Sequence, residues 1–368
     1  MKPAIIIDYY PPNHDGGDSV FARDMAIGLR EKVTPLVFTR IPEIDSTREF
    51  NDSGIKVVYL GNNWQDIILD YISNIDLVHF FQVDNLPVVQ FMKEKKDLPI
   101  LFHMEMSYRR YSELFKSDFD QDKYHQIEQK AVELSDKIIS PCNYELAQIA
   151  RLYPSANTIV VPNGINFETR LHTPFEIHKD DNKTNFAFIG RLDDPMKGGN
   201  ELIEAIEQLP VEYSKRAHFV FIGCRDTRFL YRLNLMDKDI SYEVHTWISD
   251  ESDLWDKLSQ TNFMLIPSRY ETFGMVCLEA MAMGIIPIAS DAGAMGEMII
   301  NGKNGFLIGQ PNSEMPEKIS KVIESSIDIS STQYRAMRDA AVSIARSQYN
   351  IERIVEKIIP IYDTMRQK

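Results

Sequence analysis

The feature that most constrains the fold is an alternation of short apolar runs with amphipathic segments of helical period, repeated along almost the whole chain. The first run, Ala4–Tyr10, is rich in β-branched residues and is typical of a buried parallel strand. A helix capped by Asp18 is expected next, with Phe21 and Met25 on its apolar face. Strands that alternate with helices in this way predict an α/β fold, with a parallel sheet covered on both faces.

A single interruption of this alternation divides the chain into two halves. The polar, irregular stretch at 166–185 is interpreted as a connection between domains. A second series of strands and helices begins at Phe186 and repeats the architecture of the first, although not its sequence. We therefore expect two doubly wound domains, at 1–170 and 171–345, whose strand ends face each other across a cleft, followed by a C-terminal helix at 346–368.

Composition and charge exclude several classes of protein. The 368 residues are 44% hydrophobic, which is enough for two cores. The net charge of −14 argues against binding to a nucleic-acid backbone, although a few local donors can still hold one phosphorylated small molecule. The three cysteines, Cys142, Cys224 and Cys277, are widely separated, which argues against a disulfide framework or a zinc site and favours a reducing cytoplasm.

No segment is typical of a secretion signal or of a membrane span. The apolar run at the N-terminus is too short for a signal peptide and ends at Asp8, and no stretch reaches the ~18–20 apolar residues that a span needs. The mixed aromatic and basic segment 107–126 is interpreted as a solvated loop and helix rather than as a contact for an acceptor or a membrane. We expect a cytoplasmic protein, with peripheral association at the inner face of a membrane left open.

The first candidate site follows the strand at 186–189. Arg191 and Lys197 stand six positions apart in the turn that leads to a glycine pair and a helix. A guanidinium and an ammonium group that converge at a strand end, beside a helix N-terminus, form an anion site. An equal alternative is that the two cations pair with nearby acids, namely Asp193, Asp194 and Glu201.

The second candidate site is the turn after a later strand. The backbone amides of Phe273, Gly274 and Met275 lie at the start of a predicted helix, where the helix dipole favours an anion. Glu271 precedes this helix and Glu279 lies inside it, so that both carboxylates can accept hydrogen bonds from sugar hydroxyls. Taken singly, Glu279 is explained as well by a buried acid that pairs with a neighbouring helix, and Glu271 by a partner of the helix dipole.

Weaker signals lie in the first half of the chain. Gly16 and Gly17 would allow a phosphate to approach the backbone, but the G-x-G-x-x-G fingerprint is absent and an ordinary glycine turn remains an alternative. His103 ends a predicted strand and can orient a substrate hydroxyl, stabilise charge or serve as a structural histidine. His14 and His79 are weaker candidates, and no residues have the spacing of a metal site.

Taken together, these motifs resemble the retaining, GT-B-fold glycosyltransferases of family 4, the glycosyl transferases group 1. The stretch from Ser268 is similar to the E-x7-E signature of that family, and the segment 190–199 to its R-x5-K phosphate-binding pattern. The glycine loop before the first helix, the P-N-G turn at 162–164 and the segment 293–308 follow the family's order. The resemblance therefore spans nearly the whole chain.

The resemblance implies a role for each candidate residue. Arg191 and Lys197 would neutralise the diphosphate of a nucleotide-sugar donor, and Glu279 would hold its ribose. Glu271 would grip the donor sugar and phosphate together with the backbone of a turn formed by Thr272, Phe273, Gly274 and Met275. His103 would lie near the transferred sugar, and Gly16 and Gly17 against the diphosphate or the acceptor.

The resemblance also implies an activity and an architecture. Two Rossmann-like domains would form the GT-B fold, with the C-terminal helix packed back on the first domain. The expected reaction is metal-independent, retaining transfer of a hexose from a nucleotide diphosphate sugar, which is the donor substrate, and no cofactor is expected. UDP is the expected nucleotide, with GDP and ADP as alternatives, and the acceptor would be a glycan, a glycolipid or a glycoprotein. The alternative is a catalytically silent GT-B subunit that binds glycans or stabilises a partner transferase.

Overall fold

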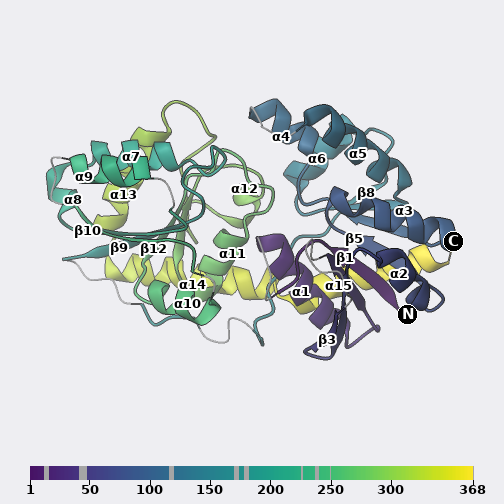
Figure 1. Cartoon of the computed structure of the whole chain (residues 1–368). Helices are drawn as coiled ribbons and strands as arrows, with labels where there is room; N and C mark the ends of the chain where they lie inside the picture. The colour runs from purple at the N-terminus through teal and green to yellow at the C-terminus, as the bar shows by residue number, and fades with distance from the viewer. Residues whose placement is uncertain are drawn as a thin grey trace. The chain divides into compact units, whose positions relative to one another are not determined.

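The computed structural model describes residues 1–11, 16–40, 48–115, 120–169, 174–177, 182–224, 227–236, 240–248 and 250–367 (Figure 1). The chain forms two compact units. Unit 1 comprises Met1–Arg170 and Tyr349–Lys368, and unit 2 comprises Leu171–Gln348. Within the described ranges, no helix combines the length and the apolar character needed to cross a membrane.

Unit 1 is built on an eight-stranded sheet with the order β3-β4-β2-β1-β5-β6-β7-β8. All neighbouring strands are parallel except β3 and β4. The strands are β1 (Pro3–Ile7), β2 (Leu36–Arg40), β3 (Arg48–Asp52), β4 (Ile55–Leu60), β5 (Leu77–Phe80), β6 (Ile100–His103), β7 (Lys137–Ser140) and β8 (Thr158–Val160). The central strand β1 is entirely buried, because its apolar residues are covered on both faces of the sheet.

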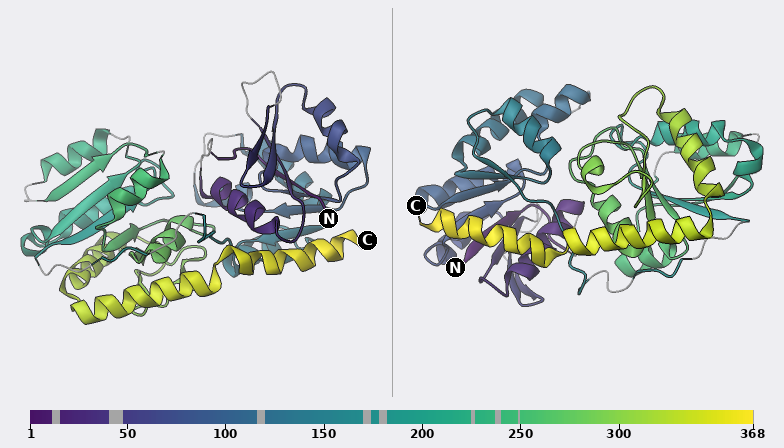
Figure 2. Two further views of the ribbon diagram at one scale, coloured as in Figure 1. Left: turned by 90° about the horizontal axis from the view of Figure 1, so that it is seen from below. Right: turned by 180° about the vertical axis from the view of Figure 1, so that it is seen from behind.

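The helices of unit 1 include one from the C-terminal end of the chain. They are α1 (Gly17–Leu29), α2 (Trp64–Ile72), the short 3-10 helix η1 (Val83–Asn85), α3 (Leu86–Lys95), α4 (Tyr108–Leu114), α5 (Gln121–Leu134), α6 (Asn143–Leu152) and α15 (Ile351–Arg366). Helix α15, yellow in Figure 2, packs against α1 and β5 through a stripe that includes Ile354, Ile358 and Tyr362, all fully buried. Gly164 permits this approach, because a Cβ atom there would lie 2.6 Å from Ile354 Cγ1.

The start of α1 corrects one expectation. The sequence predicts that Asp18 caps the helix, but α1 begins at Gly17 and Asp18 lies in its first turn. There its carboxylate accepts a hydrogen bond from the backbone amide of Ser19 (2.9 Å) and one from Gln82 Nε2 (2.5 Å). An acidic side chain in the first turn still interacts favourably with the helix dipole.

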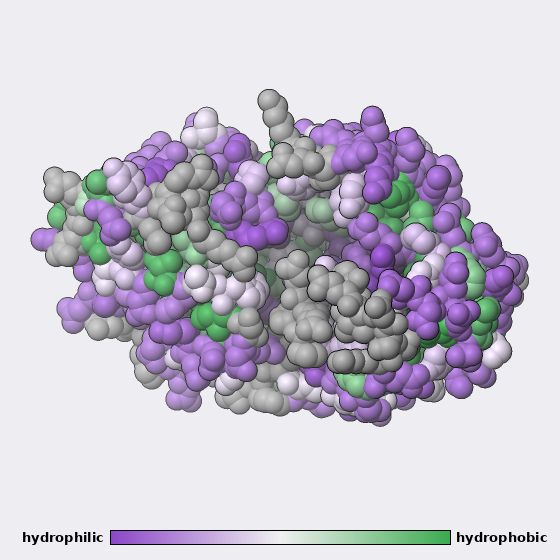
Figure 3. Space-filling model, in the orientation of Figure 1, coloured by the Kyte–Doolittle hydropathy of each residue, from purple (hydrophilic) through white to green (hydrophobic). Residues whose placement is uncertain are grey.

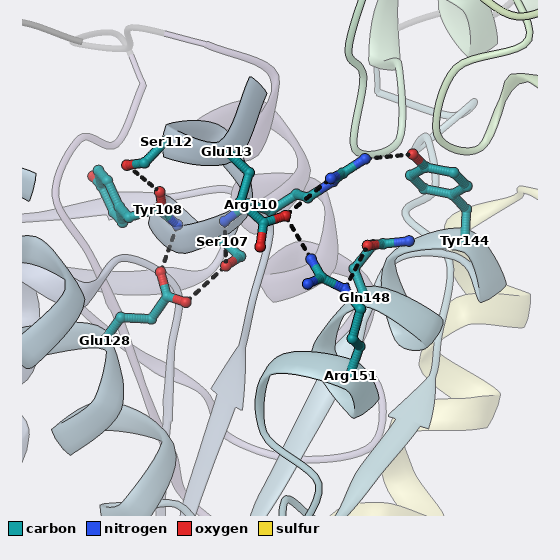
Figure 4. A network of polar contacts seen from close by, with 9 residues as sticks. All are labelled: Ser107, Tyr108, Arg110, Ser112, Glu113, Glu128, Tyr144, Gln148 and Arg151. Carbon is teal, nitrogen blue, oxygen red and sulfur yellow. Dashed lines mark hydrogen bonds and ion pairs between the residues drawn. The ribbon is translucent and has the colours of Figure 1, made fainter. Parts of the chain in front are cut away.

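Helix α4 is anchored by a buried carboxylate. Glu128, on α5, is fully buried and accepts hydrogen bonds from Ser107 Oγ (2.7 Å), from Tyr153 Oη (2.5 Å) and from the backbone amide of Tyr108 (2.5 Å). Figure 4 shows Glu128 pointing at the first residues of α4. Charge-assisted hydrogen bonds of this kind fix where the helix begins.

Unit 2 contains a six-stranded parallel sheet with the order β11-β10-β9-β12-β13-β14. Its strands are β9 (Thr184–Ile189), β10 (Ala217–Ile222), β11 (Ser241–His245), β12 (Phe263–Ile266), β13 (Ile286–Ala289) and β14 (Phe306–Leu307). Its helices are α7 (Gly199–Gln208), α8 (Val211–Ser214), α9 (Thr227–Leu235), α10 (Glu251–Leu258), α11 (Met275–Met283), α12 (Met295–Met298), α13 (Met315–Asp328) and α14 (Ser331–Gln348). Helix α13 packs on α7, and α14 on α11 and β13.

Helix α11 of unit 2 is largely buried. It is apolar almost all round, as expected for a helix enclosed by other elements, here β12, β13 and α14. It ends at Met283, and the capping residue Gly284 has a φ of +81°, a left-handed conformation that suits glycine. The face of the molecule that Figure 3 shows is mostly hydrophilic, and its apolar residues lie in small separate groups.

Candidate functional site

The candidate residues of unit 2 lie at the carboxyl ends of two central strands. β9 and β12 are neighbours, and the strand order reverses between them, since β10 lies beyond β9 and β13 beyond β12. Ligands of open α/β sheets bind at such switch points. The loop at 190–198 follows β9, and the loop at 267–274 follows β12.

Glycines allow these loops to pack closely. Gly198 has a φ of +69°, and a Cβ atom there would lie 1.9 Å from the carbonyl oxygen of Pro267. Gly293, in the loop after β13, has a φ of +57°, and its Cβ would lie 1.5 Å from the carbonyl oxygen of Glu271. Glycine is required at both positions, because any side chain would separate loops that now touch.

Lys197 and Glu271 form the centre of this arrangement. Lys197 Nζ lies 2.6 Å from Glu271 Oε1, and Ser268 Oγ donates a hydrogen bond to the same oxygen at 2.9 Å. The side chains of Lys197 and Glu271 are 26% and 13% exposed, so both are largely withdrawn from water yet reachable. Lys197 thus pairs with a carboxylate of the neighbouring loop, and not with the acids that the sequence offered as alternatives, namely Asp193, Asp194 and Glu201.

Arg191 is placed differently. Its side chain is 68% exposed and forms an ion pair with Asp194 Oδ2 at 2.8 Å, which is one of the alternatives that the sequence left open. Asp194 is held in turn by the backbone amide of Met196, which donates to Oδ1 at 2.9 Å. An ion pair this exposed is worth only about 0–1 kcal/mol, so the guanidinium can turn to another anion at small cost.

The start of α11 adds an electropositive element beside the Lys197–Glu271 pair. Gly274 precedes the helix with a φ of +90°, and a Cβ atom there would lie 2.0 Å from Met295 Cε. Phe273 is buried beneath the turn, next to the half-buried Thr272, and Met275 begins the helix. The first amides of a helix carry partial positive charge, which favours an anion at this position.

Glu279 lies in the second turn of α11, eight residues after Glu271. Its side chain is half-buried and interacts within the protein. Glu271 therefore precedes the helix, and Glu279 lies inside it.

In unit 1, β6 ends at His103, which is fully buried. Its Nδ1 lies 3.3 Å from Nε2 of His79, and its Nε2 lies 3.5 Å from Oε1 of Glu105. The ring of Phe81 stacks on its imidazole with 4.8 Å between centroids. Burial lowers the pKa of His103 to about 3, although the Asn163 side chain raises it, so the ring is neutral at physiological pH.

Glu105 and Asn163 are site residues that the sequence reasoning missed. Asn163 Nδ2 donates to both carboxylate oxygens of Glu105 at 3.0 Å. Burial raises the pKa of Glu105 to about 8, against the lowering effect of Asn163, and nearby Asp18 raises it further. Two signals were available: Glu105 stands two positions after His103, the spacing of one face of an extended chain, and Asn163 is the asparagine of the P-N-G turn.

The glycine loop of unit 1 is only partly described. Gly16 is extended with a φ of 161°, and Gly17 is the first residue of α1. His14, a weaker candidate from the sequence, lies outside the described residues. In the part of the chain that the structure covers, no three His, Cys, Asp or Glu side chains are grouped as metal ligands.

The architecture of the two units defines the class of this protein. The chain resembles sucrose-phosphate synthase from Thermosynechococcus elongatus, with a TM-score of 0.81 and 18% identity over 99% of both chains. It also resembles Anabaena HepE in complex with UDP and glucose, with a TM-score of 0.74 and 17% identity over 99% of this chain and 100% of that one. The protein has the GT-B fold, which confirms the predicted fold class.

Sequence comparison gives a family match for unit 2. Residues 170–342, nearly all of unit 2, match the model of the family Glycosyl transferases group 1. Unit 2 is therefore similar to the glycosyl transferases group 1 family, which is the family that the motifs of this half of the chain resemble.

Curated relatives match over part of their length. An uncharacterised glycosyltransferase of Methanocaldococcus jannaschii, MJ1178, is 29% identical over 195 residues, which are 52% of this chain and 50% of that protein. The D-inositol 3-phosphate glycosyltransferase of Gordonia bronchialis is 25% identical over 201 residues, 50% of this chain and 43% of that protein. The chain thus spans about half the length of these relatives.

Proposed function

We propose that this chain is a retaining, metal-independent glycosyltransferase that moves a hexose from a UDP-sugar to a glycan, glycolipid or glycoprotein acceptor. The observation that carries the proposal is the position of Lys197 Nζ, 2.6 Å from Glu271, in loops at the switch point beside the start of α11. The group 1 match of unit 2 supports the reaction class, and the UDP complex of the structural neighbour HepE supports the choice of nucleotide.

In this proposal Lys197 exchanges partners when the donor binds. The diphosphate would draw the ammonium group away from Glu271, since the diphosphate as a whole carries more negative charge than one carboxylate. Glu271, still held by Ser268 Oγ, would then accept hydrogen bonds from hydroxyls of the donor sugar. One ion pair would thereby become two contacts to the same ligand, one to its phosphate and one to its sugar.

Departure of the nucleotide is the difficult step of such a transfer. The bond between the anomeric carbon and the diphosphate oxygen breaks, and negative charge grows on that oxygen. Lys197, Arg191 and the amides that begin α11 would stabilise this charge, and each preorganised donor is worth ~2.7–4 kcal/mol. The acceptor oxygen would bond to the anomeric carbon from the same face, and its proton would pass to the leaving phosphate.

The remaining assignments follow the family pattern. Glu279 would hold the ribose of the donor, and the backbone of Thr272–Met275 its phosphate. His103 would contact the transferred sugar, and Gly16 and Gly17 would lie against the diphosphate or the acceptor. In this proposal these roles need no cofactor, and the nucleotide sugar is the donor substrate.

A panel of nucleotide sugars tests the proposal. We expect one UDP-sugar to raise the melting temperature and to be slowly hydrolysed, with the rate unchanged by a metal chelator. Lys197→Ala should lower hydrolysis by about 100-fold or more. The matched control is Lys318→Ala, which removes a lysine that is ion-paired with Glu314 at 2.9 Å on α13 and should retain wild-type activity.

Three outcomes would contradict the proposal. Full activity of Lys197→Ala would remove the assigned anion site. Failure of every nucleotide sugar to bind would favour the silent-subunit alternative. A product whose anomeric configuration is inverted, measured by NMR immediately after transfer, would exclude the retaining reaction.

A further inference from the structure

A chain of three buried side chains connects the C-terminal helix to His103. The hydroxyl of Tyr362, on α15, lies 2.7 Å from Nδ1 of His79, on β5. Nε2 of His79 lies 3.3 Å from Nδ1 of His103, at the end of β6. All three residues are fully buried, so water does not compete for these contacts.

The hydroxyl of Tyr362 determines which atom donates each hydrogen bond in this series of three side chains. In the described part of the protein its one hydrogen-bond partner is His79 Nδ1, and a buried hydroxyl that fails to donate costs about 1–3 kcal/mol. The hydroxyl therefore donates, His79 accepts at Nδ1, and the proton of this neutral ring lies on Nε2. That Nε2–H donates to Nδ1 of His103, which places the proton of His103 on its own Nε2.

The surroundings of the two rings are consistent with this direction. Burial lowers the pKa of both histidines, so each ring carries one proton and acts as donor at one nitrogen only. At the far end, Nε2 of His103 is buried and has no hydrogen-bond partner among the described residues, with Oε1 of Glu105 3.5 Å away, so this nitrogen is left to serve a ligand. The Asn163 side chain also lies at this ring and directs its amide nitrogen to Glu105, which leaves its carbonyl oxygen as an acceptor.

Aromatic packing fixes the orientation of the two imidazole rings. The two imidazoles are almost parallel, with an interplanar angle of 8° and 5.5 Å between centroids. Phe81 stacks on both of them, with centroids 5.1 Å from His79 and 4.8 Å from His103. A ring held in this way cannot flip to exchange its two nitrogens without displacing Phe81.

We infer that Tyr362 is a positioning residue that fixes the tautomer of His103 through His79, so that His103 presents an N–H donor and not a base. The consequence for catalysis rests on the proposed function. His103 would donate a hydrogen bond from Nε2 to a hydroxyl of the transferred sugar. It would not take the proton of the acceptor, because the nitrogen that could accept a proton is occupied by His79.

The tautomers can be measured directly in the substrate-free protein. Long-range 1H–15N NMR of the full chain, labelled with 15N-histidine, distinguishes Nδ1–H from Nε2–H. Contacts with the ring of Tyr362 assign His79, and contacts with the ring of Phe21 assign His103. We expect both His79 and His103 to be neutral Nε2–H tautomers at pH 7. An Nδ1–H tautomer or a charged ring at His103 would overturn the inference.

Tyr362→Phe tests the role of the hydroxyl. Without the donor, His79 should populate both tautomers, and transfer should fall by about tenfold in kcat with little change in KM. Tyr334→Phe is the matched control, because Tyr334 is a buried tyrosine of unit 2 whose hydroxyl bonds to Asn262 Nδ2 at 3.3 Å. This control should lose similar stability and leave both histidine tautomers unchanged.

The outcomes separate this inference from the proposed function. Unchanged histidine tautomers in Tyr362→Phe would overturn the role of Tyr362, whatever the activity. If the tautomers respond as expected but the wild type transfers no sugar, the proposed function fails and the hydrogen-bonded chain stands.

Discussion

At the scale of single residues, the site depends on glycines as much as on charged side chains. Gly293→Ala should cost about 3 kcal/mol or more in unfolding free energy, since a Cβ atom there would lie 1.5 Å from the carbonyl oxygen of Glu271 and φ is +57°. Urea denaturation measures this cost. The displaced Glu271 should also weaken its contact with Lys197.

Gly302→Ala is the matched control for this substitution. Gly302 has a φ of +75°, but nothing lies within 4 Å of a Cβ atom built there. Gly302→Ala should lower the unfolding free energy only by the backbone strain of a left-handed alanine, about 1–2 kcal/mol. Equal losses in the two variants would mean that the loops are not packed as described.

Glu105 gives a pH-dependent prediction. Its pKa is raised from 4.5 to about 8, so between these values the folded state binds a proton that the unfolded state releases. Stability from this group is therefore complete below pH 4.5 and is lost as the pH rises through 8. Because one pKa unit corresponds to about 1.4 kcal/mol, the stability of Glu105→Gln relative to the wild type should rise by about 4 kcal/mol between pH 5 and pH 9.

Unfolding free energies measured across that pH range test the prediction. Glu317→Gln changes an exposed acid on α13 and should leave the pH profile of the wild type unchanged. His103, whose pKa is lowered, contributes in a different window: its stability is complete above 6.5 and is lost as the pH falls toward 3. A parallel profile for Glu105→Gln and the wild type above pH 5 would contradict the raised pKa.

At the scale of elements, the sequence predicted the strands that have continuous apolar runs, but it did not predict the polar strand β3. β1, β9 and β12 follow directly from their apolar sequences, because both faces of a parallel strand are buried. β3 is polar and pairs antiparallel with β4 across a turn at Ser53 and Gly54, both with positive φ. The sequence after β3 contains a turn signal at Ser53 and Gly54, but β3 itself has no alternation of apolar and polar residues. Such an alternation is not needed in β3, because it lies at the edge of the sheet.

Helix α4 depends on the carboxylate of Glu128. Glu128→Gln should lower the unfolding free energy by about 2–3 kcal/mol, because the new amide group would face donors of Ser107 and Tyr108 that now find an acceptor (Figure 4). Amide hydrogen exchange should accelerate in Tyr108–Leu114. Glu133→Gln, an exposed change on the same helix α5, should leave exchange in α4 unaltered, and equal exchange in the two variants would refute the anchoring role.

At the scale of the whole molecule, the chain returns to unit 1 after completing unit 2. Ile358 of α15 is fully buried, so Ile358→Ala should cost about 2–5 kcal/mol. Hydrogen exchange should show faster opening of β1 and β5 in unit 1, with the strands of unit 2 unaffected. Lys357→Ala, at an exposed neighbouring position, is the control, and equal effects in both units would contradict the division of the chain.

Long-range contacts explain what the sequence could not predict. The charged residues of unit 2 lie in short motifs, so the sequence alone indicates Arg191, Lys197, Glu271 and Glu279 as candidates. It does not indicate the partner of Lys197, because Glu271 is 74 positions away in another loop. Tyr362 and His79 are 283 positions apart, and neither has a local pattern that indicates the other.

The central claim is that a nucleotide diphosphate binds at the switch point of unit 2. A crystal structure of the protein with a bound UDP-sugar tests it most directly. We predict diphosphate oxygens within hydrogen-bond distance, about 3 Å, of Lys197 Nζ and of the backbone amides at Gly274 and Met275, with Glu271 turned to the sugar. A diphosphate bound away from Lys197 and the start of α11 would contradict the account.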